Sequence, residues 1–222
     1  MGKSFSTGML TDAIAQDSSN NIGIGGAVNA SYKLTVTGSS SFSADALING
    51  ITIGRGGGNG TPNTAIGAGA LQSNTIGGVN TAVGYLAMQA NTSGTGGTGL
   101  GQSALYANTT GNGNTGIGES TLITNTTGNY NTAIGLHSLF YNTTGSYNTA
   151  LGGANAGANL TTGSNNTLVG NYQGSAGMAS NVILSDGAGN IRFQYDGTNT
   201  LLGQSGSVGI NCSPSYTLDV NG

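Results

Sequence analysis

The sequence predicts an all-β chain whose central part is a repetitive β-solenoid, or β-roll, built from 17-residue coils. A five-residue motif, Asn-Thr-Ala-Ile-Gly, recurs with small changes in seven copies, which start at residues 63, 80, 97, 114, 131, 148 and 166. The steps between them are five of 17 residues and one of 18. A helical repeat unit needs about 33 residues or more. A coil of short strands and turns therefore fits this period better.

The repeat positions, numbered 1 to 17 from the Asn, indicate how one coil is built. Position 4 is aliphatic and position 5 is Gly in all seven copies, and position 9 is Leu or Met in the first five before it becomes Ala156. We expect one strand that ends at position 5, a second that carries position 9, and a turn at positions 12 to 15, where Asn and Gly tolerate left-handed backbone. Coils then stack about 4.8 Å apart, with identical Asn and Thr side chains forming hydrogen-bonded ladders.

The apolar content of one coil is small, which predicts association between chains. Burying the aliphatic residues at positions 4 and 9 contributes about 3–6 kcal/mol, whereas ordering 17 residues costs roughly 1–2 kcal/mol per residue for the backbone alone. We therefore expect a fibrous homotrimer in which each chain buries a second face. The change at Ala156 and the extra residue before Asn166 mark where we expect the rod to loosen or change shape.

The repeats divide the chain into four segments. Residues 1–20 form an expected N-terminal attachment segment, with one helical turn near Thr11–Gln16. Residues 21–62 form a β-connector and residues 63–180 the solenoid shaft. Residues 181–222 form a C-terminal β-hairpin module, because Asp-Gly turn signals follow Val182–Ser185 and Ile191–Tyr195.

Charge is nearly absent from the repeats, and this excludes several function classes. Between Arg55 and Asp186 the only charged residue is Glu119. Nucleic-acid binding needs clustered Lys and Arg, and no apolar run approaches the roughly 20 residues of a membrane span. The single cysteine, Cys212, leaves no internal disulfide, and no signal-peptide core follows Met1. We expect no nucleic acid and no membrane insertion.

Few residues have the chemistry of a catalytic, cofactor or metal site. The Gly-x-Gly-x-x-Ala pattern at Gly99–Ala104 lacks the helix and acidic partner of a dinucleotide site. His137, the only histidine, is a weak candidate for a metal ligand on a trimer axis. Asp186–Asn190 lacks the ligand count of a calcium loop. Glycoside cleavage needs paired carboxylates, and Glu119 stands alone in the array. We expect no enzyme and no cofactor.

The variable repeat positions hold the candidates for surface binding. Aromatic faces stack on sugar rings while neighbouring amides and hydroxyls bond sugar hydroxyls, and the alternative is that about half of these side chains fill the trimer interface. The candidates are Tyr85, Tyr106, Tyr130, His137, Phe140, Tyr141 and Tyr147.

A second motif brackets the array and carries a family resemblance. Ile22–Gly25 is followed by Ser31–Gly38, and Val208–Ile210 by Ser215–Gly222, with Tyr-x-Leu-x-Val-x-Gly shared by both. Together with the Asn-Thr-Ala-Ile-Gly repeats, these motifs resemble bacteriophage tail-fibre proteins over residues 21–222. The repeats are similar, more loosely, to the head repeats of trimeric autotransporter adhesins. Both families are fibrous homotrimers that bind surfaces.

The resemblance implies a structural fibre protein of a bacteriophage or phage-like particle, extracellular on the virion, with a stiff trimeric shaft for host attachment. Its implied partners are its own copies, other virion or fibre components, and a host-surface glycan or protein. In the fibre family a trimerising chaperone commonly follows the second module, and autotransporter adhesins carry a signal peptide and a membrane barrel. The sequence shows none of these three features, and whether a chaperone is removed by processing stays open. A bacterial surface adhesin and a polysaccharide depolymerase spike stay open as alternatives, whereas an ice-binding solenoid would need flat Thr-x-Thr rows, and position 4 is aliphatic instead.

Overall fold

The computed structural model describes residues 51–57, 62–198 and 200–202, together with the strands at 14–16, 22–24, 34–36 and 46–48. The described residues form strands and turns and no helix. The chain divides into two units, residues 1–43 and residues 44–222. The predicted all-β class is confirmed, whereas Cys212 and the module at Val208–Gly222 lie outside the described residues.

The first unit contains a three-stranded sheet of β1 (Ile14–Gln16), β2 (Ile22–Ile24) and β3 (Leu34–Val36). β1 pairs antiparallel with β2, and β2 pairs parallel with β3. The helical turn expected near Thr11–Gln16 is wrong for its last three residues, because they pair with β2 as a strand. The strands expected in the first part of the β-connector are confirmed.

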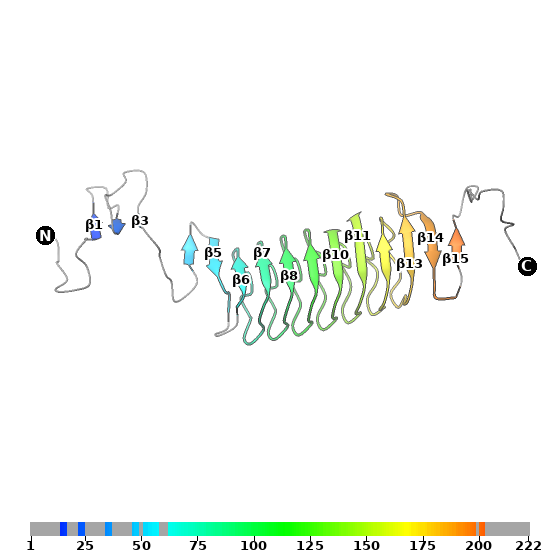
Figure 1. Cartoon of the computed structure of the whole chain (residues 1–222), viewed down its shortest axis with the longest axis horizontal. Helices are drawn as coiled ribbons and strands as arrows, with labels where there is room; N and C mark the ends of the chain where they lie inside the picture. The colour runs from blue at the N-terminus through cyan, green and yellow to red at the C-terminus, as the bar shows by residue number, and fades with distance from the viewer. Residues whose placement is uncertain are drawn as a thin grey trace, which may run out of the picture. The chain divides into compact units, whose positions relative to one another are not determined.

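The second unit is a β-solenoid of about seven coils with a single twelve-stranded sheet (Figure 1). Neighbouring strands pair in parallel from β6 through β13, and antiparallel strands continue the sheet at both ends. The strands are β4 (Ala46–Ile48), β5 (Ile51–Gly54), β6 (Thr64–Ile66), β7 (Thr81–Val83), β8 (Thr98–Leu100), β9 (Thr115–Ile117), β10 (Thr132–Leu136), β11 (Thr149–Ala154), β12 (Thr167–Val169), β13 (Val182–Ser185), β14 (Ile191–Tyr195) and β15 (Thr200–Leu202).

The strand of each coil turns its small residue inward and its aliphatic residue outward. Ala65, Ala82 and Ala133 at position 3 are fully buried, whereas Ile117 and Ile134 at position 4 are 36% and 40% exposed. The expectation that position 4 belongs to the core is therefore wrong. Strand side chains alternate between faces. In the coils whose core is filled by a buried Leu or Met at position 9, the inward position 3 has room only for Ala or Gly.

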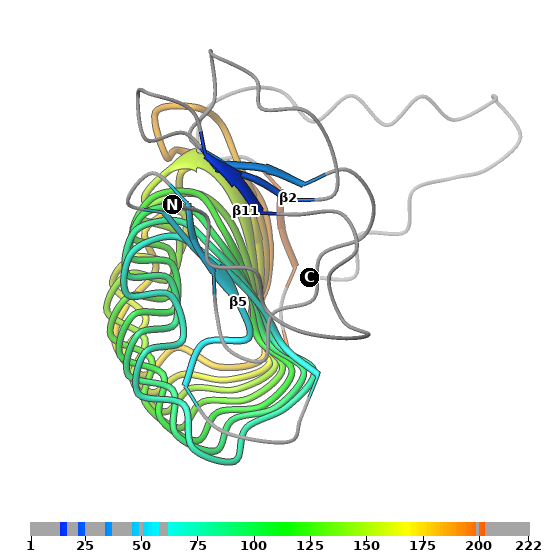
Figure 2. The same ribbon diagram turned by 90° about the vertical axis from the view of Figure 1, so that its left-hand side faces the viewer.

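Five of the seven coil strands end just before the Gly at position 5, whereas β10 and β11 continue through it, and two physical reasons require Gly at this corner. Gly101 has a φ of 134°, a backbone conformation that L side chains rarely adopt. A Cβ at Gly101 would also lie 2.5 Å from the carbonyl oxygen of Gly118 in the next coil. Figure 2, a view along the solenoid, shows the chain rounding this corner and returning along the opposite wall. We call positions 8 to 12 of each coil the back wall.

The predicted second strand, carrying position 9, is wrong because the back wall is made of turns. Position 9 is left-handed in five coils, with φ of 51–55° at Leu71, Met88, Leu105, Leu122 and Leu139. Left-handed backbone costs about 1–2 kcal/mol for such residues, and complete burial of each side chain offsets that cost. Backbone hydrogen bonds still join the back walls of neighbouring coils; for example, Leu105 N donates to Thr121 O at 2.9 Å.

The turn at positions 12 to 15 also differs from the expectation. Its Asn and Gly are not left-handed; the left-handed residue is position 17, as at Val79, Tyr130 and Tyr147. Position 15 requires Gly because a side chain there would collide with neighbouring atoms, not because its backbone is left-handed. A Cβ at Gly94 would lie 2.5 Å from both Gly111 O and Asn91 Oδ1.

Buried asparagine ladders hold the coils together, as the repeat predicts. At position 1, each Asn Oδ1 accepts the backbone N–H of the next coil at 2.7–3.1 Å. Each Nδ2 closes its own coil on the carbonyl at position 15, as in Asn131 to Gly145 at 2.8 Å. At position 12, Asn74, Asn91, Asn108, Asn125 and Asn142 bond side chain to side chain at 2.7–2.9 Å.

The sixth coil contains the one-residue insertion, at a bulge in β11 rather than just before Asn166. Leu136 pairs with Ala154 after a register shift, which leaves Gly153 as the extra residue. Ala156 consequently occupies position 8 and Gly157 position 9. Leu160 replaces the ladder Asn and is fully buried, so the core is refilled where we expected the rod to loosen. Asn142 Oδ1 is left as the one buried side-chain polar atom without a partner among the described residues.

The end of the solenoid confirms the hairpin predicted at its C-terminal side. β13 pairs antiparallel with β14 through the turn at Asp186. β13 also pairs parallel with β12, so Asn181–Ser185 supplies an eighth rung of the parallel sheet beyond the segment we assigned to the shaft. Leu168 and Ile183 replace the small inward residue on these last rungs, and both are fully buried.

Candidate functional site

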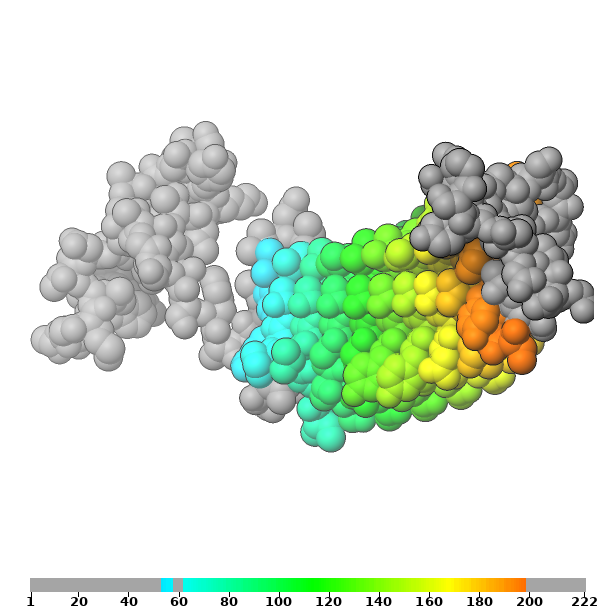
Figure 3. All heavy atoms as spheres, turned by 45° about the vertical axis from the view of Figure 1, so that its right-hand side comes forward, coloured from blue at the N-terminus to red at the C-terminus, as the bar shows by residue number. Residues whose placement is uncertain are grey.

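The outer face of the solenoid sheet carries a row of aliphatic side chains that runs the length of the solenoid. Position-4 side chains of successive coils follow one another in register along the sheet. The row is continued by Ile53 on β5, which pairs with Ile66, and by Leu184 on β13, which pairs with Val169. Figure 3 shows side chains of successive coils aligned in such rows along the rod. We call this aliphatic row the sheet-face row; it consists of Ile53, Ile66, Val83, Leu100, Ile117, Ile134, Leu151, Val169 and Leu184.

The sheet-face row is partly exposed over its whole length. Ile53, Ile134 and Leu184 are 40%, 40% and 45% exposed. Scattered exposed apolar residues are ordinary on soluble proteins, whereas a contiguous row marks an interaction surface. The sequence motif contains this row at position 4. Only the structure shows that these side chains point out of the solenoid.

The seven surface-binding candidates separate into three groups. Tyr130 and Tyr147 lie in the turns that precede β10 and β11 and stack on each other, with ring centroids 5.2 Å apart. Tyr85 is 57% exposed at position 6 and makes no ring contact with another described residue. The remaining four, Tyr106, His137, Phe140 and Tyr141, belong to the same side of the solenoid.

These four residues, with Ile123, form what we call the back-wall patch. Tyr106, Ile123 and Phe140 occupy position 10 of three successive coils. His137 meets Phe140 edge to face at a centroid distance of 4.9 Å, and Phe140 meets Tyr141 edge to face at 4.8 Å. The structure thus adds His137 to the row that the repeat positions already indicated, whereas Tyr106 lies two coils from Phe140 and makes no ring contact with it.

The residues considered for catalysis or metal binding are not brought together. Within the described ranges, no group of three or more His, Cys, Asp or Glu side chains is placed to hold a metal ion. Gly99–Ala104 spans strand β8 and the corner at Gly101, which accounts for its glycines without a ligand.

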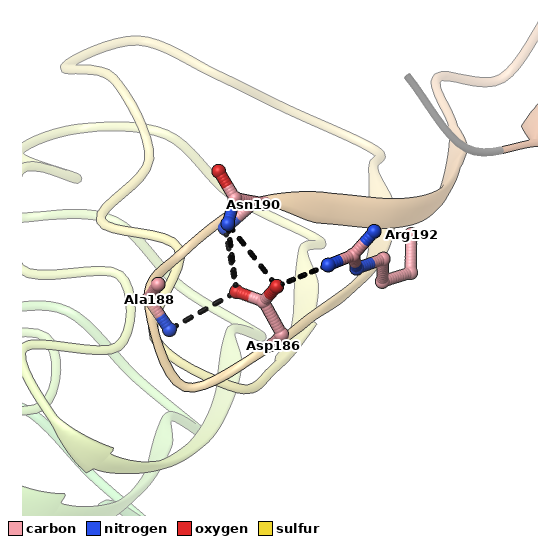
Figure 4. A network of polar contacts seen from close by, with 4 residues as sticks. All are labelled: Asp186, Ala188, Asn190 and Arg192. Atoms are coloured by element: carbon pink, nitrogen blue, oxygen red, sulfur yellow. Dashed lines mark hydrogen bonds and ion pairs between the residues drawn. The ribbon is translucent and has the colours of Figure 1, made fainter. Parts of the chain in front are cut away.

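The turn at Asp186 is satisfied by the chain itself (Figure 4). Its carboxylate accepts hydrogen bonds from the side chain and backbone of Asn190, from Ala188 N at 3.0 Å, and from Arg192 Nη2 at 2.6 Å. These contacts, those of the Asn190 side chain first, lower the pKa of Asp186 to about 2. The carboxylate therefore works as a turn-stabilising acceptor.

Two further findings bear on function. No helix in the described part of the chain is long and apolar enough to cross a membrane. No protein-family model, curated protein or solved structure matches the chain.

Proposed function

We propose that this chain is a shaft protein of a bacteriophage or phage-like tail fibre, working as a homotrimer that presents a host-attachment surface. The sheet-face row is the observation that carries the proposal. It runs through every coil at one spacing of about 4.8 Å, so the partner that matches it best is another copy of the same rod. A small ligand would contact only a few coils of the sheet-face row, whereas a second rod can contact all of them.

The row has enough unburied area to support association. Full burial of an aliphatic side chain contributes about 1.5–3 kcal/mol, so covering the exposed two-fifths of Ile134 contributes roughly 1 kcal/mol. Repeated along the rod, this gain is of the size that stable complexes need after the cost of association. The near absence of charge between Arg55 and Asp186 adds no electrostatic repulsion between parallel copies.

Association is tested by light scattering on the purified chain after size-exclusion chromatography. We expect a mass near three times 21.7 kDa. The double variant Ile117→Asp/Ile134→Asp should be monomeric, because it places unpaired charge in the buried interface. Thr127→Asp/Thr144→Asp is the matched control, since it adds the same charges on the same two coils at exposed turn positions; it should stay trimeric. A monomeric natural chain would refute the proposal.

Whether the protein lies on tail fibres or on the bacterial surface is tested by immunogold electron microscopy with antibodies raised against the shaft. We expect label along the tail fibres of particles released by the producing cells. Label on the bacterial surface, without labelled particles, would favour a surface adhesin. Shortening of a capsular polysaccharide by the purified chain would favour the depolymerase.

A further inference from the structure

The back-wall patch differs from the sheet-face row in extent. The row belongs to every coil, whereas position 10 is aromatic or aliphatic only in the coils of Tyr106, Ile123 and Phe140. On one side of the patch position 10 holds Gln72 and Gln89, whose amides bond each other at 2.9 Å, and on the other side it holds Ala158. A local feature of this kind fits a discrete ligand better than a second rod.

The patch is also held rigid before any ligand arrives. Ala107 N donates to Ile123 O at 3.0 Å, and Tyr141 N donates to Ala158 O at 3.0 Å. The Thr124 hydroxyl donates to Phe140 O at 2.7 Å. Because the backbone beneath the rings is already ordered, binding costs little conformational entropy.

The chemistry of the patch combines aromatic surface with free hydroxyls. Tyr106 and Tyr141 are 36% and 52% exposed, and their hydroxyls make no hydrogen bond to the described part of the chain. Between Arg55 and Asp186 the array contains no Lys or Arg, so an anionic polymer meets neither of these side chains at the patch. A neutral carbohydrate matches this combination, because sugar rings offer apolar C–H faces between hydroxyl groups.

The spacing fits an extended oligosaccharide. Tyr106 and Phe140 are two coils apart, which places them about 10 Å apart along the rod. That distance is comparable to the length of one disaccharide unit, so sugars at alternate positions of a chain can stack on the two rings.

We propose that the back-wall patch binds a neutral glycan chain lying along the rod, with Tyr106 and Phe140 as stacking platforms and Tyr141 as a hydrogen-bonding edge. The assignment rests on the proposed function in one respect: partner copies cover the sheet face and leave the back wall, on the opposite side of each coil, open to solvent (Figure 2).

The test is saturation-transfer NMR, followed by titration of the full chain with a panel of neutral oligosaccharides of six to eight sugars. The panel contains α- and β-linked glucans, mannans and galactans, and an anionic uronic-acid oligomer is the comparison. We expect at least one neutral member to bind and the anionic oligomer not to bind. Tyr106→Ala and Phe140→Ala should each weaken binding about tenfold, and Tyr141→Phe should weaken it less.

Tyr130→Ala and Tyr147→Ala are the controls, because they remove aromatic rings that are more exposed than those of Tyr106 and Phe140 from the same rod. They should leave the dissociation constant within about twofold. The proposal is overturned if no neutral oligosaccharide binds, if the anionic oligomer binds better, or if the controls lose binding as strongly as the patch variants. The mass from light scattering separates the two proposals, since a trimer without glycan binding contradicts only this one.

Discussion

Replacing single asparagines by leucine along the position-12 ladder tests how the solenoid is held together. Asn125 lies inside the ladder: its Nδ2 donates to Asn108 Oδ1 at 2.8 Å and to Gly128 O at 3.1 Å, and its Oδ1 accepts from Asn142 Nδ2 at 2.7 Å. Asn142 is the last Asn of the ladder, because Leu160 follows it and its Oδ1 has no partner.

The two substitutions are expected to lower the free energy of unfolding by different amounts. Asn125→Leu removes three hydrogen bonds at about 1 kcal/mol each and leaves Asn108 Oδ1 buried with at best a weak partner, for a total of about 3–5 kcal/mol. Asn142→Leu removes two bonds, to Asn125 Oδ1 and Gly145 O. It moves the unsatisfied buried acceptor from Asn142 Oδ1 to Asn125 Oδ1, so those two terms cancel, and it adds contact with Leu160. Its expected net cost is about 1–2 kcal/mol.

The assay is thermal unfolding followed by far-ultraviolet circular dichroism, at one protein concentration for all variants because association shifts the midpoint. At about 2–4 °C per kcal/mol for a chain of this size, Asn125→Leu should lower Tm by about 6–20 °C and Asn142→Leu by about 2–8 °C. Equal losses for the two variants would refute the view that ladder continuity stabilises the coils.

Two further predictions concern local geometry. Gly101→Ala should lower Tm strongly, because the new Cβ meets Gly118 O at 2.5 Å on left-handed backbone, whereas Gly177→Ala, with nothing within 4 Å, should not; equal effects in the same melting assay would contradict this. Asp186 has a pKa of about 2 when folded, below its ordinary 3.8, so its stabilisation of the turn is present above about pH 4 and lost as pH falls through 2. NMR titration of the carboxyl and amide exchange at Ala188 should show this, and Asp186→Asn should abolish the pH dependence; a carboxyl that titrates near 3.8 would be inconsistent with the contacts.

Much of the coil was predictable because the repeat places the same residue at the same height in every rung. The Asn ladders follow from a fixed period of 17 and from the preference of identical amides to bond in register. The hairpin after Val182 followed from its turn residues. Charge depletion points away from nucleic acid, and this stays a prediction.

The errors arose where two assignments were equally compatible with the pattern. Positions 4 and 9 are both aliphatic, so the pattern predicts that both lie in the core. Because left-handed Leu is rare, the pattern also predicts a strand at position 9. The sequence does not distinguish Gly152 from Gly153, so it locates the insertion only by the late start of the next repeat at Asn166.

The sequence by itself determined the number of coils, their period, the corner glycines and the residues that form ladders, because these depend on local backbone limits and on identity between repeats. Only the tertiary structure decided which aliphatic row faces outward. That choice depends on how much room lies between the two walls: the strand lies close to the back wall, so Ala65 and its equivalents fit inside while Ile66 and its equivalents are forced out. The same constraint that keeps the core thin therefore creates the surface through which we propose the chains associate.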